Sequence, residues 1–125
     1  MAALLFLGGA RILPMKYVLL ICDNEVDPPS QEELAVDPVH DEYQHALAQR
    51  GTSLGGARLR PSSHATSVRV RDGEVLVTHG PFAETKDFVG GITILECADL
   101  DDAIEIASKH PYARRGVIEI RPVWE

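Results

Sequence analysis

The chain has 125 residues, of which 45% are hydrophobic and 25% charged, the composition of an ordinary globular domain. This length is enough for one hydrophobic core and too short for two, and it needs no metal or disulfide to fold. The formal charge of −7 argues against nucleic acid or an anionic membrane surface as a partner, because both attract clustered Lys and Arg. The sequence therefore predicts one acidic domain with no direct nucleic-acid or membrane partner.

The cysteine content indicates a reducing compartment. Cys22 and Cys97 are too few for a disulfide framework, and neither belongs to a cluster with zinc-binding spacing. We therefore expect two reduced thiols, in or beside apolar strands, in a cytoplasmic protein.

The amino-terminal segment, residues 1–14, is apolar but fits neither a membrane helix nor a secretory signal. The apolar run at residues 2–7 is too short for a membrane helix, and no basic residue precedes it as in a secretory signal. Met15 then opens a second, β-rich start. We interpret residues 1–14 as an extension upstream of the true start and residues 15–125 as the single domain.

The first predicted elements are a buried strand and two helices. Residues 17–22 are continuously apolar, which predicts a strand covered on both faces and central in its sheet. Ser30 and Glu33 have the spacing of a capping box, which predicts a short helical turn over residues 31–36. A longer helix over residues 38–50 follows an Asp N-cap and ends before a Gly.

Strands dominate the middle of the chain. Residues 52–60 are typical of an irregular strand, and residues 67–78 alternate as a hairpin with the turn pair Asp72 and Gly73. Residues 91–97 predict a further strand.

One more helix and one strand complete the chain. Asp99 caps the helix, whose apolar stripe we expect to contain Leu100, Ala103, Ile104 and Ala107. Residues 117–121 alternate as the last strand, with two isoleucines on one face.

This order of elements predicts an α+β ferredoxin-like fold with a mixed, largely antiparallel sheet and two helices on one face. The opposite face, with its valines, is then partly bare. An exposed apolar sheet face of this size usually has a partner, so we expect a homodimer built through the sheet face.

Candidate functional residues must be sought singly, because the sequence contains no P-loop, HExxH, GxSxG or dinucleotide-binding motif. His40 is the first candidate, as a general acid or base oriented by Asp37, Asp41 or another carboxylate. A half-buried packing role is its structural alternative. His79, at a strand end before a Gly-Pro turn, is the second candidate, and a simple turn residue is the alternative.

Charged residues add candidates for binding an anionic substrate. Lys86 or Arg58 would hold the anion, whereas Glu84 and Lys86 form a solvated charged run in the alternative interpretation. The spacing of His40, His64 and His79 gives no support to a metal site, so we predict neither metal nor cofactor.

Two histidines are expected to be structural. His45 points to solvent from the first helix, and His110 lies in the last turn of the second helix as a partner of the helix dipole.

A longer pattern resembles a known family. The matching segments are residues 15–21, 75–87, 90–91, 99–103, 110–111 and 118–125. They resemble the YciI-related, DGPF-motif proteins over residues 15–125. The resemblance implies a dimeric ferredoxin-like α+β barrel with a pocket in each protomer near the sheet and the first helix. It also implies a His and Asp active-site pair for the YciI branch, and a regulatory link to extracytoplasmic-function sigma factors for the DGPF branch.

The motif of that family maps onto single residues here. His40 matches the helical His, and the motif residues are Gly80, Pro81, Phe82, Glu84 and Lys86, to which the resemblance gives a ligand-binding role. His79 stands where the family has its leading Asp. If that Asp orients a ligand or a His, the replacement either removes this pair or exchanges it for a His/His arrangement, which raises the prospect of a transition-metal or anion site.

Two functions remain open from the sequence. The first is a dimeric module that binds an unknown small ligand or acts in regulation, which the lack of a nucleophile or cofactor motif favours. The alternative is a small-molecule enzyme with His40 as general acid or base. The enzyme requires that His40 face a cavity together with a carboxylate or His79.

Overall fold

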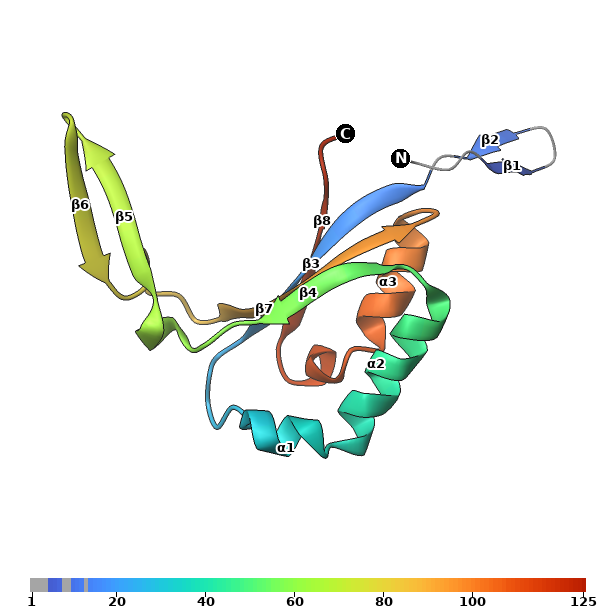
Figure 1. The fold of residues 1–125 in the computed structure, drawn as a ribbon, viewed down its shortest axis with the longest axis horizontal. Helices are drawn as coiled ribbons and strands as arrows, with labels where there is room; N and C mark the ends of the chain where they lie inside the picture. Colours follow the sequence, from blue (N-terminus) through green and yellow to red (C-terminus); the bar gives the residue numbers. More distant parts are fainter. Residues whose placement is uncertain (1–4, 8–9, 13) are drawn as a thin grey trace.

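The computed structural model describes residues 5–7, 10–12 and 14–125. Its centre is a four-stranded sheet in the order β4-β7-β3-β8, and each described pair in it is antiparallel (Figure 1). The bounds of these strands are β3 (Met15–Asp23), β4 (Ser53–Arg58), β7 (Phe88–Cys97) and β8 (Val117–Pro122). Helices α2 (Pro38–Arg50) and α3 (Leu100–Ser108) lie on one face of the sheet (Figure 1). This arrangement confirms the predicted α+β ferredoxin-like fold.

Capping residues place the helices where the sequence predicts them. The Ser30 hydroxyl accepts a 3.0 Å hydrogen bond from the Glu33 N–H, and the Glu33 carboxylate accepts from the Ser30 N–H at 3.2 Å. This capping box starts α1 (Gln31–Ala35). The Asp37 carboxylate accepts from two backbone N–H groups in the first turn of α2. Both helix starts are therefore confirmed.

The predicted hairpin forms a separate two-stranded sheet of β5 (Thr66–Arg71) and β6 (Glu74–His79). Asp72 and Gly73 both have positive φ, 51° and 80°, as a type I′ turn requires. The hairpin follows a short 3₁₀ turn, η1 (Ser62–His64), and projects from one end of the central sheet on the side away from the helices (Figure 1).

The core lies between the sheet and the two helices. Its buried side chains on the sheet are Leu19, Ile21 and Leu95, which pack with residues of α2 and α3. Tyr17 and Cys97 form a second cluster under α3. Cys97 is buried, Cys22 is half-buried, and both are free thiols within strands, as predicted.

The apolar stripe of α3 differs from the prediction. Ala103, Ile106 and Ala107 are buried, whereas Leu100 and Ile104 are 49% and 48% exposed. Both sets fit helical spacing, but α3 is turned so that Ile106 joins Leu19 and Leu95 in the core. The predicted stripe is therefore wrong at Leu100 and Ile104.

The other face of the sheet carries the side chains that alternate with the core residues. Val18 lies opposite Ile94 and Leu20 lies opposite Ile92 across the β3–β7 pair, and all four are half-buried. Both long helices lie on the opposite side (Figure 1). We call this surface the bare face.

The predicted extension, residues 1–14, lies partly outside the described residues. Within it, β1 (Leu5–Leu7) pairs with β2 (Ala10–Ile12) in antiparallel register. Its interpretation as an upstream extension remains a prediction. Among the helices of the described residues, none has the length and apolar character needed to span a bilayer.

Candidate functional site

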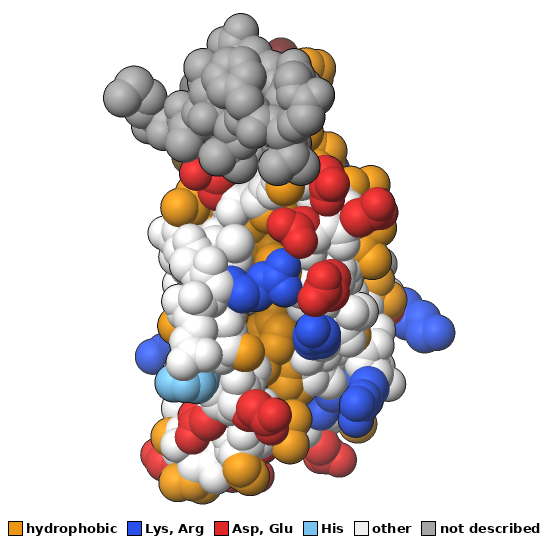
Figure 2. All heavy atoms as spheres, turned by 90° about the vertical axis from the view of Figure 1, so that its right-hand side faces the viewer, with side chains coloured by type: hydrophobic (Ala, Val, Ile, Leu, Met, Phe, Trp, Pro, Cys, Tyr) orange, Lys and Arg blue, Asp and Glu red, His pale blue; other side chains and the backbone are white. Residues whose placement is uncertain are grey.

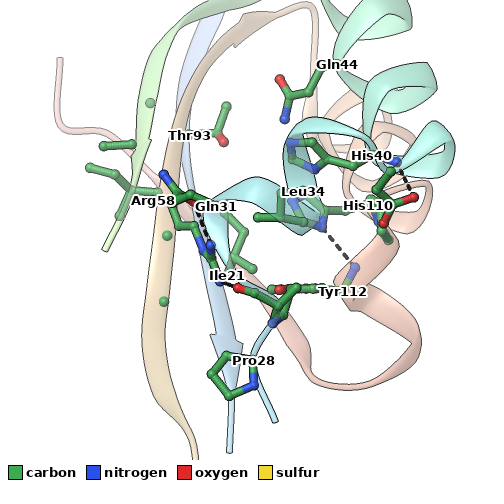
Figure 3. Close-up of a pocket in the computed structure, with 18 of the residues that line it drawn as sticks. Ile21, Pro28, Gln31, Leu34, His40, Gln44, Arg58, Thr93, His110 and Tyr112 are labelled. Atoms are coloured by element: carbon green, nitrogen blue, oxygen red, sulfur yellow. Dashed lines mark hydrogen bonds between the residues drawn. The ribbon is translucent and has the colours of Figure 1, made fainter. Parts of the chain in front are cut away.

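The main cavity has a volume of about 960 Å³ and lies between α1, α2 and the half of the sheet formed by β4 and β7 (Figure 3). Ile21 and Thr93 contribute from the sheet, and His40 and Gln44 from α2. The segment from residue 27 to residue 35 forms a further wall. The cavity therefore occurs where the two long helices leave the sheet partly uncovered.

Glycines make the floor of this cavity flat. Gly56 pairs with Thr93 and Gly91 pairs with Arg58 in the β4–β7 ladder, on the same face as the core. A Cβ atom on Gly56 would lie 2.4 Å from the carbonyl oxygen of Ile92, so the close approach of the strands requires glycine there. The two glycines therefore allow close packing of the strands and contribute backbone rather than side chains to the cavity lining.

His40 is a half-buried residue in the first turn of α2, and it lines the cavity (Figure 3). The Asp37 carboxylate accepts hydrogen bonds from the backbone of Val39 and His40, at 2.9 and 3.4 Å, and is thus engaged in capping the helix. Asp41 also lines the cavity. His40 and these two carboxylates therefore line the same cavity. This is one of the two alternative arrangements, a carboxylate or His79 beside His40, that the enzyme hypothesis needs.

His110 also lines this cavity, which the sequence did not indicate. Helix α3 ends at Ser108, and His110 is the N-cap of the 3₁₀ helix η2 (Pro111–Arg114). Its Nδ1 accepts a 3.1 Å hydrogen bond from the Tyr112 N–H. The only local signal is a His directly before Pro, since a side-chain acceptor followed by Pro at the first helical position is a common helix start.

The charge state of His110 corrects its predicted role. Burial, and secondarily the nearby His40, lower the pKa of His110 from 6.5 to about 4. The ring is therefore neutral at pH 7 and cannot serve as a cation at a helix end. Its edge contacts the Tyr43 ring, with centroids 4.8 Å apart and planes at 61°. The interpretation of His110 as a dipole partner is wrong.

Arg58 lies at the cavity, but its guanidinium is engaged with protein groups. Nη1 donates to Oε1 of Gln31 at 2.6 Å, and Nη2 donates to the carbonyl of Pro29 (Figure 3). These contacts join β4 to the start of α1. A ligand would meet Arg58 at the rim, where the side chain already holds the wall in place.

Two further contacts fix the loop between β3 and α1. The Glu25 carboxylate accepts from the N–H and hydroxyl of Ser62 at 2.8 and 2.7 Å. Arg115 forms a 2.8 Å ion pair with Asp23 and donates to the carbonyl of Val26 at 2.7 Å. Asp23 is 7% exposed, so this ion pair compensates a buried carboxylate.

His79 and the motif residues lie away from the cavity within one chain. His79 is the last residue of β6, and the chain then turns with the Gly80 N–H donating to the Ala65 carbonyl at 2.7 Å. Phe82 is 79% exposed, and Glu84 and Lys86 are exposed. None of the residues from 79 to 86 is among those that line the cavity. The structure therefore does not bring His79 to His40.

The described part of the chain offers no candidate metal centre. There, no group of three or more His, Cys, Asp or Glu side chains is placed to hold a metal ion. His40, His64 and His79 are accordingly not brought together.

A second groove, of about 600 Å³, runs between α2 and the end of α3. Val39, Tyr43 and Ala46 line it, and Val39 is 58% exposed. Arg50 spans the two helices with ion pairs to Asp102 and Glu105 at 3.0 and 3.2 Å. Figure 2 views this side and shows hydrophobic side chains between charged ones.

Comparison with known proteins adds a family. The sequence profile of the YCII-related domain matches residues 15–125. An uncharacterised protein of Rhizobium meliloti (strain 1021) is 41% identical over 69 residues, which are 54% of this chain and 56% of that protein. The chain thus spans about half the length of the curated relative it matches. The name of that relative states no activity, so the chemistry has to be argued from the site.

Proposed function

We propose that this protein, which belongs to the YCII-related domain family, is a dimeric module that binds a small molecule in the cavity beside His40. The observation that carries the proposal is the cavity itself. Its volume of about 960 Å³ lies within the range of small-molecule sites, and it combines a backbone floor with a few polar side chains. His40 is the polar side chain of α2 that we expect to contact the ligand.

The proposed dimer contact includes the bare face and the β5–β6 hairpin. Val68 pairs with Val77 and Val70 with Val75, so the four valines share one face of the hairpin. Each of them is between 57% and 66% exposed. A two-stranded hairpin is only marginally stable in water by itself, which favours coverage by a partner.

Charge on the bare face is compatible with a symmetric partner. Lys16 lies opposite Glu96, and Arg121 of β8 lies next to Glu119 with a 3.1 Å ion pair. A two-fold interface pairs a surface with itself, so a patch with both signs of charge can place opposite charges against each other. A second copy of this chain is therefore the partner that we propose for this face.

The segment from residue 79 to residue 86 follows the hairpin and belongs to the same proposal. Its exposed Phe82 is suited to contact the partner, and a ligand-binding role for the segment would then involve the dimer. The regulatory use, with a sigma-factor link, rests on the resemblance to DGPF-motif proteins. In this form of regulation, a bound ligand would alter the surface of the dimer.

The alternative function is a small-molecule enzyme with His40 as general acid or base. The position of His40 in a cavity that Asp41 also lines favours this alternative. An enzyme and a binding module would use the same cavity. Turnover of a compound that binds there distinguishes them.

A thermal-shift screen of small metabolites and metal ions tests the proposal. A compound that binds the folded state raises the melting temperature by mass action. We expect stabilisation by at least one class of small organic compound. A protein that no compound stabilises, or whose binders leave the NMR signals of the cavity residues unchanged, would contradict ligand binding in the cavity.

A further inference from the structure

The two ring nitrogens of His110 differ in their contacts, because Nδ1 forms a hydrogen bond within the protein and Nε2 forms none with any residue that the structure describes. A backbone N–H can only donate, so the 3.1 Å contact from Tyr112 makes Nδ1 of His110 the acceptor. A neutral imidazole carries its single hydrogen on the other nitrogen, which is Nε2. His110 is therefore a hydrogen-bond donor at Nε2.

The ring of His110 is held in place from two sides. Its nitrogen caps η2, directly before Pro111, and its edge packs against the ring of Tyr43 on α2. The rings of His110 and His40 enter the same part of the cavity from different elements (Figure 3). Within the described residues, no protein atom accepts a hydrogen bond from Nε2 of His110. The ring also lines the second groove, but Figure 3 shows it in the cavity beside His40, where this hydrogen can meet a ligand.

We propose that His110 is a ligand-binding residue of this cavity, which donates its Nε2 hydrogen beside His40 to an oxygen acceptor, a carbonyl or a carboxylate, on the small molecule. The inference rests on the proposed function, because it assigns a contact within the same cavity. His40 of α2 supplies a second imidazole in the same part of the cavity. A carboxylate has two oxygens and can accept from both rings, whereas a carbonyl accepts at one oxygen.

The ionised groups around the two rings are of both signs. The charged side chains that line the cavity are Asp27, Glu33, Asp37, Asp41, Arg58 and Arg115. Both arginines are engaged with protein groups, because Arg58 donates to Gln31 and to the Pro29 carbonyl and Arg115 pairs with Asp23. The donor at His110 selects for an acceptor on the ligand, because a ligand with only N–H donors leaves Nε2 without a partner.

Nuclear magnetic resonance of the full-length, ¹⁵N-labelled protein tests this inference through long-range ¹H–¹⁵N correlations of the histidine rings. At pH 7 we expect His110 to carry its hydrogen on Nε2. Acetate and acetamide serve as carboxylate and carbonyl probes, and methylammonium serves as a donor-only probe at matched ionic strength. We expect acetate, acetamide or both to shift the rings of His110 and His40 together, methylammonium to shift neither, and the exposed His45 and His64 to stay unchanged.

Two variants separate the two nitrogens of His110. H110N keeps an acceptor for the Tyr112 N–H but lacks the Nε2 donor. We expect this variant to bind whichever of acetate and acetamide shifts the wild-type rings about three- to ten-fold more weakly, as measured at the His40 ring, which is the effect of one hydrogen bond. H110Q keeps an N–H donor at a similar reach, and we expect it to retain more of the response. Melting temperatures near that of the wild type establish that both variants are folded.

Several results would overturn the inference. They are a hydrogen on Nδ1 of His110, a response to methylammonium alone, and no response of His110 to either oxygen probe. A shift of His40 without His110 would remove His110 from the site and leave the cavity as a binding site. The proposed function itself fails only in the separate compound screen, so the two failures are distinguishable.

Discussion

Nη1 of Arg58 lies 2.6 Å from Oε1 of Gln31, and this contact joins the edge strand β4 to the start of α1 across the rim of the cavity. The same guanidinium donates to the carbonyl of Pro29. No residue of α1 is buried, so the wall that α1 forms depends on such side-chain contacts rather than on a core of its own. Arg58 therefore controls how firmly one wall of the cavity is held.

Arg58→Ala should loosen this wall without unfolding the domain. We expect amide hydrogen exchange over residues 30–36 to become about five- to ten-fold faster, because local opening loses about 1 kcal/mol of hydrogen bonding. The free energy of global unfolding should change by less than about 1 kcal/mol, since the side chain is exposed. Arg60→Ala, at an exposed arginine two residues further on, is the control. Equal exchange in the two variants would show that Arg58 does not hold α1.

A charge on the valine face of the hairpin should separate the proposed dimer. Val77→Glu places a carboxylate on that face, and burying it against a partner costs several kcal/mol, which raises the dimer dissociation constant on the order of 100-fold or more. Leu76→Glu changes the neighbouring residue, which points to the other face of the hairpin, and should leave the dimer largely intact. Sedimentation velocity at micromolar concentration measures both. A monomeric wild-type protein, or equal dissociation constants for the two variants, would refute the proposed interface.

The lowered pKa of His110 predicts how stability depends on pH. The unfolded chain takes up a proton on this ring near pH 6.5, whereas the folded protein resists protonation until about pH 4. The free energy of unfolding should therefore fall as the pH decreases from 6.5 to 4. Above pH 6.5 the ring is neutral in both states, so His110 causes no change of stability with pH there. The neighbouring titratable groups are His40 and Tyr43 of α2 and Tyr112 of η2.

Urea unfolding at several pH values measures this contribution. His110→Asn should lose less stability between pH 6.5 and pH 4 than the wild type, because it removes the group that protonates only on unfolding. His45→Asn, at an exposed position of α2, should follow the wild type. Parallel pH profiles for the wild type and His110→Asn would contradict the buried, neutral state of His110.

The glycine floor of the cavity makes a further prediction. Gly56→Ala places a Cβ atom 2.4 Å from the Ile92 carbonyl oxygen, so the strands must separate, at a cost of about 1–3 kcal/mol in unfolding free energy. Gly90→Ala meets only the Ile21 carbonyl, at an ordinary 3.8 Å, and should change stability by less than about 1 kcal/mol. Chemical denaturation compares the two. A Gly56→Ala variant as stable as Gly90→Ala would mean that β4 and β7 can separate at Gly56 at no cost, which would contradict the need for glycine there.

The parts of the fold that sequence predicts well are those encoded locally. The Ser30 and Glu33 capping box and the Asp72-Gly73 turn each place their own hydrogen bonds within a few residues. The stripe of α3 is different, because helical spacing allows either Ile104 or Ile106 to face the core. How α3 packs on the sheet decides between them, and it places Ile106 against Leu19 and Leu95.

The site was predictable only in part, for the same reason. His40 combines an imidazole with the first turn of a helix that an Asp N-cap and a Pro mark in the sequence. Arg58 has its partner Gln31 at 27 residues' distance, so its charge alone indicated a ligand rather than a wall contact. His110 meets Tyr43 and the cavity through the tertiary fold, and no local pattern marks that contact.

Calorimetric titration of a compound from the thermal-shift screen into the wild type, His40→Ala and His45→Ala tests whether the ligand binds in the cavity beside His40. Both substitutions replace a histidine of α2, but only His40 lines the cavity. We expect His45→Ala to bind the compound as the wild type does, and His40→Ala to bind it at least about ten-fold more weakly, a loss of roughly 1.4 kcal/mol or more. Equal affinity of the wild type and His40→Ala for every compound that binds would contradict it.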